Sequence, residues 1–336
     1  MPRSSACARW LTSKALAEIH MTQIVTLTIN PALDVSTSVK KMVPFTKMRC
    51  APALRDPGGG GINVARVLKR LGIDVIAIYP AGGATGQLLE KLVEREGVRS
   101  VVIPASNDTR EDLTIFDETT REQFRLVFPG APLSDIEWQN CLGSIARIHP
   151  QPAFVIASGS LPAGVPHDFF GKVAQASHAH SKVIVDTSGP FLKPALEAGV
   201  YLIKPNLREF QELAGITSND DAALIEAGRR LFDRYRIEVI AISMGPEGAL
   251  LATREMALRA SGLPIEPISV SGAGDSFLGA MVWSLANNGS LELALRYGVA
   301  GGSAALLNPG TELCRPEDVH RLASEVTVTP IARNQR

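Results

Sequence analysis

The sequence predicts an α/β fold in which helices cover both faces of a mostly parallel central sheet, with a small sheet beside it. Short, continuously apolar segments at residues 154–157, 183–185, 201–203 and 239–242 alternate with segments of helical periodicity. Continuous apolar strands are typical of a parallel sheet that is buried on both faces. The chain has 336 residues, 45% of them hydrophobic, so one large domain with an appendage can form.

The same alternation begins in the first half of the chain. Residues 24–30 alternate apolar side chains with threonine and stop at Pro31, which indicates a strand. Apolar residues at helical spacing predict a helix at residues 62–71 and another at residues 85–96. A strand is expected between them, at residues 75–79.

The region before the first strand is expected to lie outside the fold. Residues 1–20 are basic and contain a single acid, a composition that a transit peptide can have. Because the strand pattern begins directly after Met21, a natural start at Met21 is the simpler interpretation. We therefore expect one domain at residues 21–330.

One region departs from the strand–helix alternation. Residues 113–117 and 123–128 are strand-like and are joined by four polar residues, which favours a hairpin. Residues 35–39 and 47–54 are expected to supply further strands. The small sheet would thus use residues 33–54 and 110–130, either as a lid over a cleft or as an extension of the central sheet.

Charge and cysteine usage limit the possible partners. The formal net charge is zero and no basic stripe is present, so a nucleic-acid partner is not expected. No apolar segment reaches membrane-spanning length, so no membrane partner is expected either. The four cysteines lack metal-site or disulfide spacing, which favours reduced thiols in the cytoplasm.

Two glycine-rich segments are candidates for ligand contact. In the first, four glycines that include Gly58 and Gly59 lead into a predicted helix whose first turn contains Asn63, a candidate ligand of a sugar hydroxyl. The second runs Gly272-Ala273-Gly274-Asp275 into a helix of small apolar residues. Such a helix start presents free backbone amides and the positive end of the helix dipole, so it can bind an anion beside the Asp275 carboxylate. Helix capping alone is the alternative for Asp275.

Two common nucleotide-binding motifs are absent. The third glycine of a dinucleotide fingerprint would fall on Phe277 or on Asn63, and Gly171-Lys172 lacks the rest of a Walker A loop. A phosphate-transfer enzyme with this sequence therefore uses another architecture.

The two glycine segments resemble the two signatures of the ribokinase/PfkB family of carbohydrate kinases. Other segments match in the order found in that family, and the resemblance covers the chain from about residue 21 to its end; these segments are residues 28–34, 81–86, 128–131, 158–162, 204–209, 243–249 and 308–311. The resemblance implies a ribokinase-like three-layer α/β/α fold with the small sheet as a lid. Within the family it is strongest to the 6-phosphofructokinases.

This resemblance implies transfer of the ATP γ-phosphoryl group to a sugar hydroxyl. Asp275 is expected to be the base, and the amides of Gly272, Ala273 and Gly274 are expected to stabilise the charge on the moving phosphoryl group.

The resemblance also implies a nucleotide site. Nucleotide contacts are expected from Lys204, Asn206, Ser243, Gly245 and Gly248. Glu209, together with Asn206, is expected to hold Mg²⁺ and its waters, with Asp186 as a further candidate ligand.

The implied acceptor is a sugar phosphate, and fructose 6-phosphate is the expected one. Asp34 is expected to accept from a sugar hydroxyl. Further substrate contacts are expected from Gly58, Gly59 and Asn63 of the first glycine segment, from the basic residues Lys47, Arg49 and Arg110, and from Ser158 and Ser160. Each basic residue taken singly is more often a solvated surface charge.

Some positions depart from the family pattern. Glu111 and Asp112 follow Arg110, where uncharged residues are expected, and they could alter sugar selectivity or inhibition by excess ATP. Residues 269–271, Ala305, Asn308 and Gly310 resemble a loop that binds K⁺ in some members, although Glu312 replaces an arginine there. K⁺ dependence is therefore left open.

Alternatives remain for substrate, class and assembly. 1-Phosphofructokinase and tagatose-6-phosphate kinase share nearly all of these motifs. A non-catalytic sugar- or nucleotide-binding protein could use the same fold. A homodimer through the lid is expected from the resemblance alone.

Overall fold

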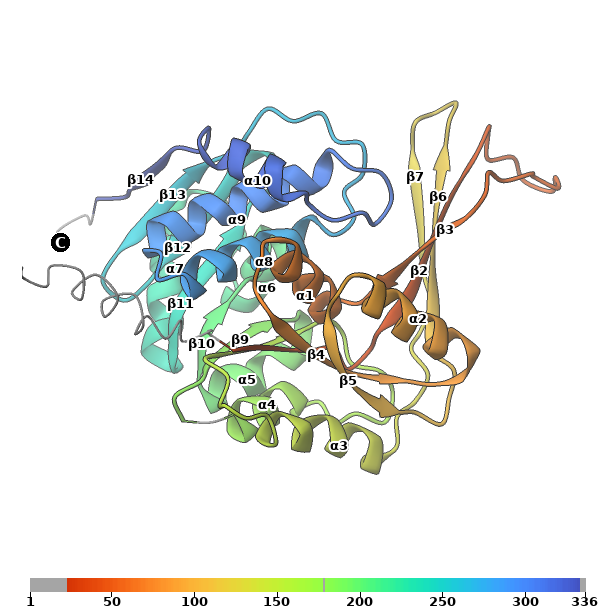
Figure 1. Cartoon of the computed structure of the whole chain (residues 1–336). Coiled ribbons are helices and arrows are strands. Elements are labelled where there is room, and N and C mark those ends of the chain that lie inside the picture. Colours follow the sequence, from red (N-terminus) through yellow and green to blue (C-terminus); the bar gives the residue numbers. More distant parts are fainter. Residues whose placement is uncertain (1–22, 178, 333–336) are drawn as a thin grey trace, which may run out of the picture.

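The computed structural model describes residues 23–177 and 179–332 (Figure 1). The expected extension at residues 1–20 lies outside these described residues. In the described part of the chain, ten strands form one sheet in the order β14-β13-β12-β11-β10-β9-β8-β1-β4-β5. The segment from β5 to β11 is parallel and the edge from β12 to β14 is antiparallel. The bounds are β1 Ile24–Leu27, β4 Val75–Ala81, β5 Arg99–Pro104, β8 Phe154–Ser158, β9 Lys182–Asp186, β10 Val200–Ile203, β11 Ile237–Ser243, β12 Gly248–Ala252, β13 Ala257–Ser261 and β14 Val328–Pro330.

Helices cover both faces of this sheet and enclose one apolar core on each side. One face packs against α1 Gly60–Arg70, α2 Gly83–Arg95, α8 Ala273–Ala286, α9 Leu291–Leu306 and α10 Pro316–Ala323. The other packs against α3 Asp135–Ala146, α4 Phe169–Ala176, α5 Leu192–Ala198, α6 Leu207–Ala214 and α7 Asp221–Arg234. The central strands are apolar throughout because both of their faces are buried. The predicted three-layer α/β/α fold is confirmed.

A second, four-stranded sheet projects from the main body in the order β3-β2-β6-β7 (Figure 1). Its strands are β2 Ala32–Val39, β3 Leu54–Gly58, β6 Arg110–Asp117 and β7 Gln123–Val127. The expected β6–β7 hairpin is confirmed, and this sheet is separate from the large one. We call it the small sheet.

Two expected strand positions were wrong. Residues 40–53 form a long connection, and the strand expected at residues 47–54 instead occupies Leu54–Gly58. Pro57 is tolerated there because β3 is an edge strand, where a missing N–H costs no ladder hydrogen bond. The first strand also ends at Leu27, three residues before the expected Asn30.

Among the described residues, no helix combines the length and the apolar character needed to cross a membrane.

Candidate active site

Polar side chains converge at the carboxyl ends of the central parallel strands. Ser158 ends β8, Asp186 ends β9, Lys204 follows β10 and Ser243 ends β11. These strands are neighbours in the sheet, so the four residues lie along one edge. Ligands of open α/β sheets bind at this edge.

The start of α8 faces the same edge. Gly272 is its N-cap residue, and Asp275 lies in the first turn. The Nζ of the buried Lys204 lies 3.5 Å from the position that a Cβ on Gly274 would take. Free backbone amides and a buried ammonium group therefore surround one point, which suits an anion.

The carboxyl group of Asp275 is held by the first glycine segment. The Nδ2 of Asn63, from α1, donates to its Oδ2 over 2.9 Å. Burial, with a further contribution from the nearby Asp186, raises the pKa of Asp275 to about 6, against the opposing effects of Asn63, Lys204 and Arg125. Asp275 is therefore a carboxylate at neutral pH and accepts a proton more readily than an exposed aspartate does.

The orientation of the Asn63 amide is fixed by Arg66, which is only 1% exposed. Arg66 Nη1 donates to Asn63 Oδ1 over 3.2 Å and to the carbonyl oxygen of Pro57 over 2.9 Å. An arginine only donates, so it must face the oxygen of the amide. The Asn63 Nδ2 is thereby directed at Asp275. Glu96 accepts from the Arg66 guanidinium at 2.8 and 3.0 Å and holds it in place.

A row of aspartates crosses the small sheet beside this site. Asp34 on β2 is the direct neighbour of Asp56 on β3 and of Asp112 on β6. Asp56 contacts Arg66 at 3.6 Å and accepts from Thr311 at 2.9 Å. Among the described residues, Asp34 accepts no hydrogen bond. Burial, with a further contribution from Asp112, raises the pKa of Asp34 to about 7.

Close backbone approach explains the glycines next to this row. A Cβ on Gly58 would lie 2.4 Å from the Asp34 carboxyl, and one on Gly60 would lie 2.2 Å from Ser158 Oγ. A side chain at either glycine would collide with Asp34 or Ser158, because neither contact leaves room for a methyl group.

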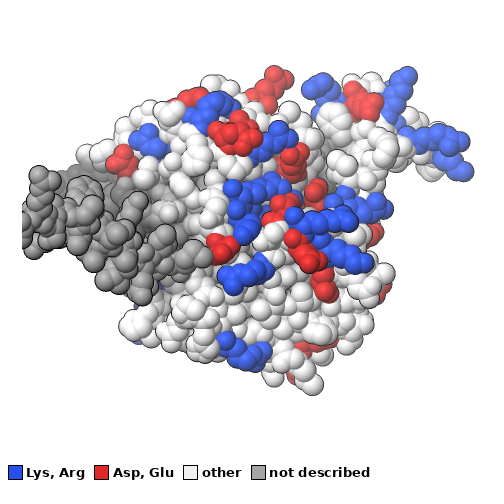
Figure 2. All heavy atoms as spheres, in the orientation of Figure 1, with Lys and Arg blue, Asp and Glu red and all other residues white. Residues whose placement is uncertain are grey.

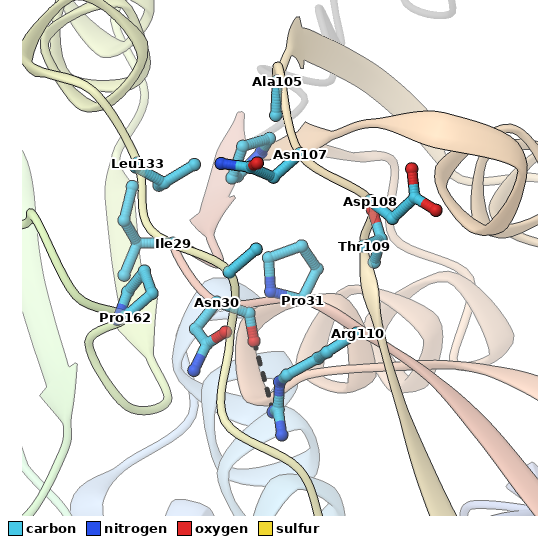
Figure 3. A pocket seen from close by; sticks show the side chains of 12 residues that line it. Ile29, Asn30, Pro31, Ala105, Asn107, Asp108, Thr109, Arg110, Leu133 and Pro162 are labelled. Atoms are coloured by element: carbon cyan, nitrogen blue, oxygen red, sulfur yellow. Dashed lines mark hydrogen bonds between the residues drawn. The ribbon is translucent and has the colours of Figure 1, made fainter.

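Arg110 is already engaged by the protein. Its Nη1 lies 2.8 Å from both carboxylate oxygens of Asp112 and donates to the carbonyl oxygen of Phe128 at 3.0 Å. Figure 3 shows its guanidinium reaching the backbone of Asn30, where Nη2 donates over 3.4 Å. The positive charge of Arg110, the predicted phosphate ligand, is therefore already paired with the carboxylate of Asp112.

Asp186, Lys204 and Glu209 form a charged group on the nucleotide side. Lys204 Nζ lies 3.4 Å from Asp186 Oδ1. Burial raises the pKa of Asp186, which Lys204 lowers and the Glu209 carboxylate raises. Two carboxylates that repel each other beside a phosphate site suit Mg²⁺, a cation that prefers oxygen ligands and keeps several waters. Within the described residues, no cluster of three or more His, Cys, Asp or Glu side chains could hold a metal by itself.

The comparison with known proteins agrees with this geometry. Residues 32–318 match the family described as pfkB family carbohydrate kinase. The chain belongs to this family. It is 43% identical over 309 residues to the ATP-dependent 6-phosphofructokinase isozyme 2 of Mycobacterium tuberculosis, covering 91% of each chain.

Solved structures of one pfkB kinase are closely similar. The phosphofructokinase-2 from Escherichia coli in complex with fructose-6-phosphate matches with a TM-score of 0.85 and 37% identity, covering 91% of this chain and 99% of that one. The same enzyme in complex with potassium gives a TM-score of 0.86 and 38% identity, with the same coverage.

Most of the predicted residues lie together. Two of them, Asn206 and Glu209, also make hydrogen bonds to each other's backbone. Asn206 and Glu209 form a capping box at the start of α6: Asn206 Oδ1 accepts from the Glu209 amide and Glu209 Oε2 from the Asn206 amide, both at 2.9 Å. This leaves Glu209 Oε1 for water or metal. Gly245 and Gly248 form the turn that follows Ser243, and Ser160 accepts from Asn30 at 2.9 Å.

Lys47 and Arg49 are not brought to the site. Both are exposed on residues 40–53, at the free end of the small sheet, where basic side chains gather (Figure 2). The described residues of a single chain therefore leave these two predicted substrate ligands away from Asp275.

Three functional candidates were missed in the sequence. Arg66 and Asp56 are described above, and Arg125 on β7 lies close enough to lower the pKa of both Asp34 and Asp275. Alternation along β7 places Arg125 on the same face as Gln123, which contacts the main body. That alternation was the one available signal for Arg125, and nothing local marks Arg66.

The loop at residues 308–313 joins the small sheet to the start of α8. Thr311 donates to Asp56, and Gly310 accepts from Ser269 Oγ at 2.8 Å. Gln123 Nε2 of the small sheet donates to the same Ser269 Oγ at 3.3 Å. Most of the residues expected to bind K⁺ are thereby brought together around Ser269, Ser271 and Gly310.

Proposed function

We propose that this pfkB kinase phosphorylates fructose 6-phosphate to fructose 1,6-bisphosphate with ATP. The observation that carries the proposal is the pairing of Asp275 with the open start of α8, opposite the Asp34 and Arg110 side of the small sheet. The names of the similar enzymes support the same acceptor. The reaction is a phosphoryl transfer, in which positioning and charge stabilisation supply most of the catalysis.

In this proposal Asp275 orients the acceptor hydroxyl and takes its proton as the new bond forms. Asn63 occupies Oδ2, so Oδ1 faces the hydroxyl. Asp34, which has no other partner among the described residues, binds a second hydroxyl of the sugar. Arg110 and Arg125 supply positive charge for the phosphate that the acceptor already carries.

The donor phosphates would lie at the start of α8. The amides of Gly272, Ala273 and Gly274 point to this place, and Lys204 balances the charge that develops on the moving group. Ser243, Gly245 and Gly248 line the nucleotide side. Mg²⁺ would be held by the ATP phosphates and, through water, by Glu209 and Asp186, where it neutralises phosphate charge.

Turnover with different acceptors tests the proposal. Purified full-length chain with MgATP should release ADP with fructose 6-phosphate and much more slowly with fructose 1-phosphate, tagatose 6-phosphate or ribose. Faster turnover with one of the other sugar phosphates would show that this sugar phosphate, and not fructose 6-phosphate, is the preferred acceptor. No turnover on any acceptor would favour a non-catalytic binding protein.

An Asp275→Asn variant tests the base directly. We expect its turnover to fall by about 10²- to 10⁴-fold, the usual contribution of a positioned base. Glu94→Gln, on the exposed side of α2, serves as the control and should keep full turnover. Unchanged turnover in Asp275→Asn would rule out the assigned role.

We further propose that the small sheet acts as a lid and that two chains dimerise through it. Alternation directs Asp34, Asp56, Asp112 and Arg125 toward the site, and the opposite face carries apolar side chains beside the charged Arg55 and Glu111. That outer face includes Val35, Leu113, Ile115, Phe124 and Leu126, of which Phe124 and Leu126 are exposed. An apolar sheet face of this kind is typical of an interface. In such a dimer, Lys47 and Arg49 would serve the site of the partner chain.

The proposal also includes a cytoplasmic location and stimulation by K⁺. The buried, free thiols Cys141 and Cys314 suit the reducing cytoplasm, where ATP is available. The arrangement around Ser269 supports stimulation by K⁺, and the similar enzyme from E. coli has been crystallised with potassium.

A further inference from the structure

The base of the small sheet contains an ion pair whose acidic member, Asp112, has no role in the proposed reaction. Asp112 and Arg110 lie two residues apart on β6 and therefore on the same face, and their side chains are 17% and 10% exposed. Asp112 is also the direct neighbour of Asp34 on β2. Asp112 is thus next to both Arg110, the proposed ligand of the acceptor phosphate, and Asp34, the proposed ligand of a sugar hydroxyl.

The donors of Arg110 are partly occupied. Nη1 is taken by Asp112 and by the carbonyl oxygen of Phe128, and Nη2 has only a long contact to Asn30. The buried Nε has no partner in the described part of the chain. An arginine binds phosphate most strongly through two parallel N–H groups. A phosphate entering here must displace Asp112 or bind beside its negative charge, and either event weakens binding.

We propose that Asp112 competes with the phosphate group of the acceptor for Arg110 and thereby sets how tightly this enzyme binds a phosphorylated sugar. The inference rests on the proposed function only in taking the acceptor to be a sugar phosphate. Asp112 acts through Arg110 and through its charge, and it is a determinant of affinity and specificity.

A purely structural role for Asp112 makes a different prediction. Its Oδ1 accepts the backbone N–H of Phe128 at 3.0 Å, just after β7. In Asp112→Asn this oxygen remains, so the backbone contact is kept while the charge is lost. If Asp112 only anchored Phe128 and held Arg110 in place, Asn would leave acceptor affinity unchanged or would weaken it.

Calorimetric titration of fructose 6-phosphate into the full-length chain, without nucleotide, measures the affinity. We expect Asp112→Asn to bind roughly tenfold more tightly than the wild type, the scale of one removed charge contact. Glu94→Gln is the control, because it removes the same charge from an exposed residue of α2, away from the small sheet's outer face. It should bind as the wild type does.

Steady-state kinetics give the second readout. In Asp112→Asn, the KM for fructose 6-phosphate should fall while the KM for ATP and the KM for unphosphorylated fructose stay the same. A general change in the site would move all three constants together, and that outcome would overturn the inference, as would equal or weaker binding by Asp112→Asn. Failure of the proposed function would instead appear as absent turnover in the wild type and Glu94→Gln alike.

The pH dependence supplies a third readout that a structural role would not move. Asp34 is faced by Asp112 and Arg110 of β6, Arg125 of β7, Arg66 of α1 and Asp56 of β3. Removing the Asp112 charge lowers the pKa of Asp34 from its raised value of about 7. The titration of the Asp34 carboxyl group, followed by NMR, should shift to lower pH in Asp112→Asn and stay in place in Glu94→Gln.

Discussion

Two carboxyl groups of the site are prepared for different tasks. Burial raises the pKa of both Asp34 and Asp275, yet Asp275 keeps the lower value, about 6 against about 7, because Asn63 donates to it and Lys204 lies near. Near neutral pH Asp275 is therefore mostly ionised, whereas Asp34 is close to half protonated. A proton acceptor must be ionised, while a hydroxyl ligand can work in either state.

The Asn63 contact should be visible in the pH profile. Because the proposed base Asp275 can take a proton only when it is ionised, kcat/KM should fall as the pH drops below about 6. Asn63→Leu removes the donor that lowers the pKa of Asp275, so the acidic limb should move to higher pH. The substrate ionises in the same way with the wild type and with Asn63→Leu. A difference between their pH profiles therefore comes from the protein.

A surface asparagine provides the control for this shift. Asn140→Leu changes an exposed residue of α3 and should leave the profile in place. An Asn63→Leu profile that shifts to lower pH, or does not shift, would contradict the assigned contact.

Sequence patterns found the residues of the site that lie in local motifs. Asp275 and the glycines were identifiable because their chemistry depends on a helix start, which neighbouring residues encode. Arg66 was not identifiable, since its role depends on contacts with Pro57, Asn63 and Glu96 that only the folded chain creates. The pairing of Asp112 with Asp34 likewise depends on strand register, which a single sequence does not reveal.

At the scale of elements, one buried carboxylate anchors α3 to the sheet. Glu137 accepts from the amide and hydroxyl of Ser134, completing a capping box, and from the amide and hydroxyl of Ser106, which follows β5. Burial alone would raise the pKa of Glu137, but these four donors outweigh it and lower the pKa to about 2. The ionised side chain is therefore part of the folded structure.

Glu137→Ala should lower the free energy of unfolding by about 1–3 kcal/mol, because it leaves buried donors without partners. Urea denaturation near pH 7 measures this loss. A group with a lowered pKa stabilises the fold above its unfolded pKa of 4.5, and this contribution disappears as the pH falls toward about 2. The difference between Glu137→Ala and wild type should shrink over the same interval.

The control for this prediction is Gln139→Ala, an exposed position of the same helix, which should unfold as the wild type does. An equal loss in both variants would show that helix propensity, and not the Glu137 contacts, explains the effect.

The elements themselves were largely predictable, and the exceptions have physical causes. Apolar runs located the central strands, because burial on both faces requires such runs. Strand β3 of the small sheet was misplaced, since Pro57 and Gly58 are typical of turns. At a sheet edge proline is tolerated, and β3 begins at Leu54, the last residue of the predicted strand, and ends four residues beyond it.

For the whole molecule, the outer face of the small sheet predicts the assembly. We expect the wild type to be a dimer by light scattering after size-exclusion chromatography. Leu126→Glu places a charge on this face, where Leu126 is 48% exposed in the single chain, and should give monomers. Dissociation into monomers should also lower turnover at low substrate concentration, because Lys47 and Arg49 could then no longer contact substrate in the site of the partner chain.

Ile136→Glu is the matched control, since Ile136 is an exposed apolar residue of α3 on the main body, 71% accessible. It should remain dimeric. Dimers of Leu126→Glu, or monomers of the wild type, would remove the proposed interface. The sequence indicated which residues form this sheet. That one face carries the site residues and the other the exposed apolar residues followed only from the strand register.

The loop at residues 308–313 has a mechanical consequence. It touches the small sheet through Thr311, and Leu313 packs against Gly272 where α8 begins. If the small sheet moves outward as the proposed lid, this loop would transmit the displacement to the backbone amides at the start of α8, where the donor phosphates are proposed to bind. Sugar binding and nucleotide alignment would then be coupled through the same short segment of backbone.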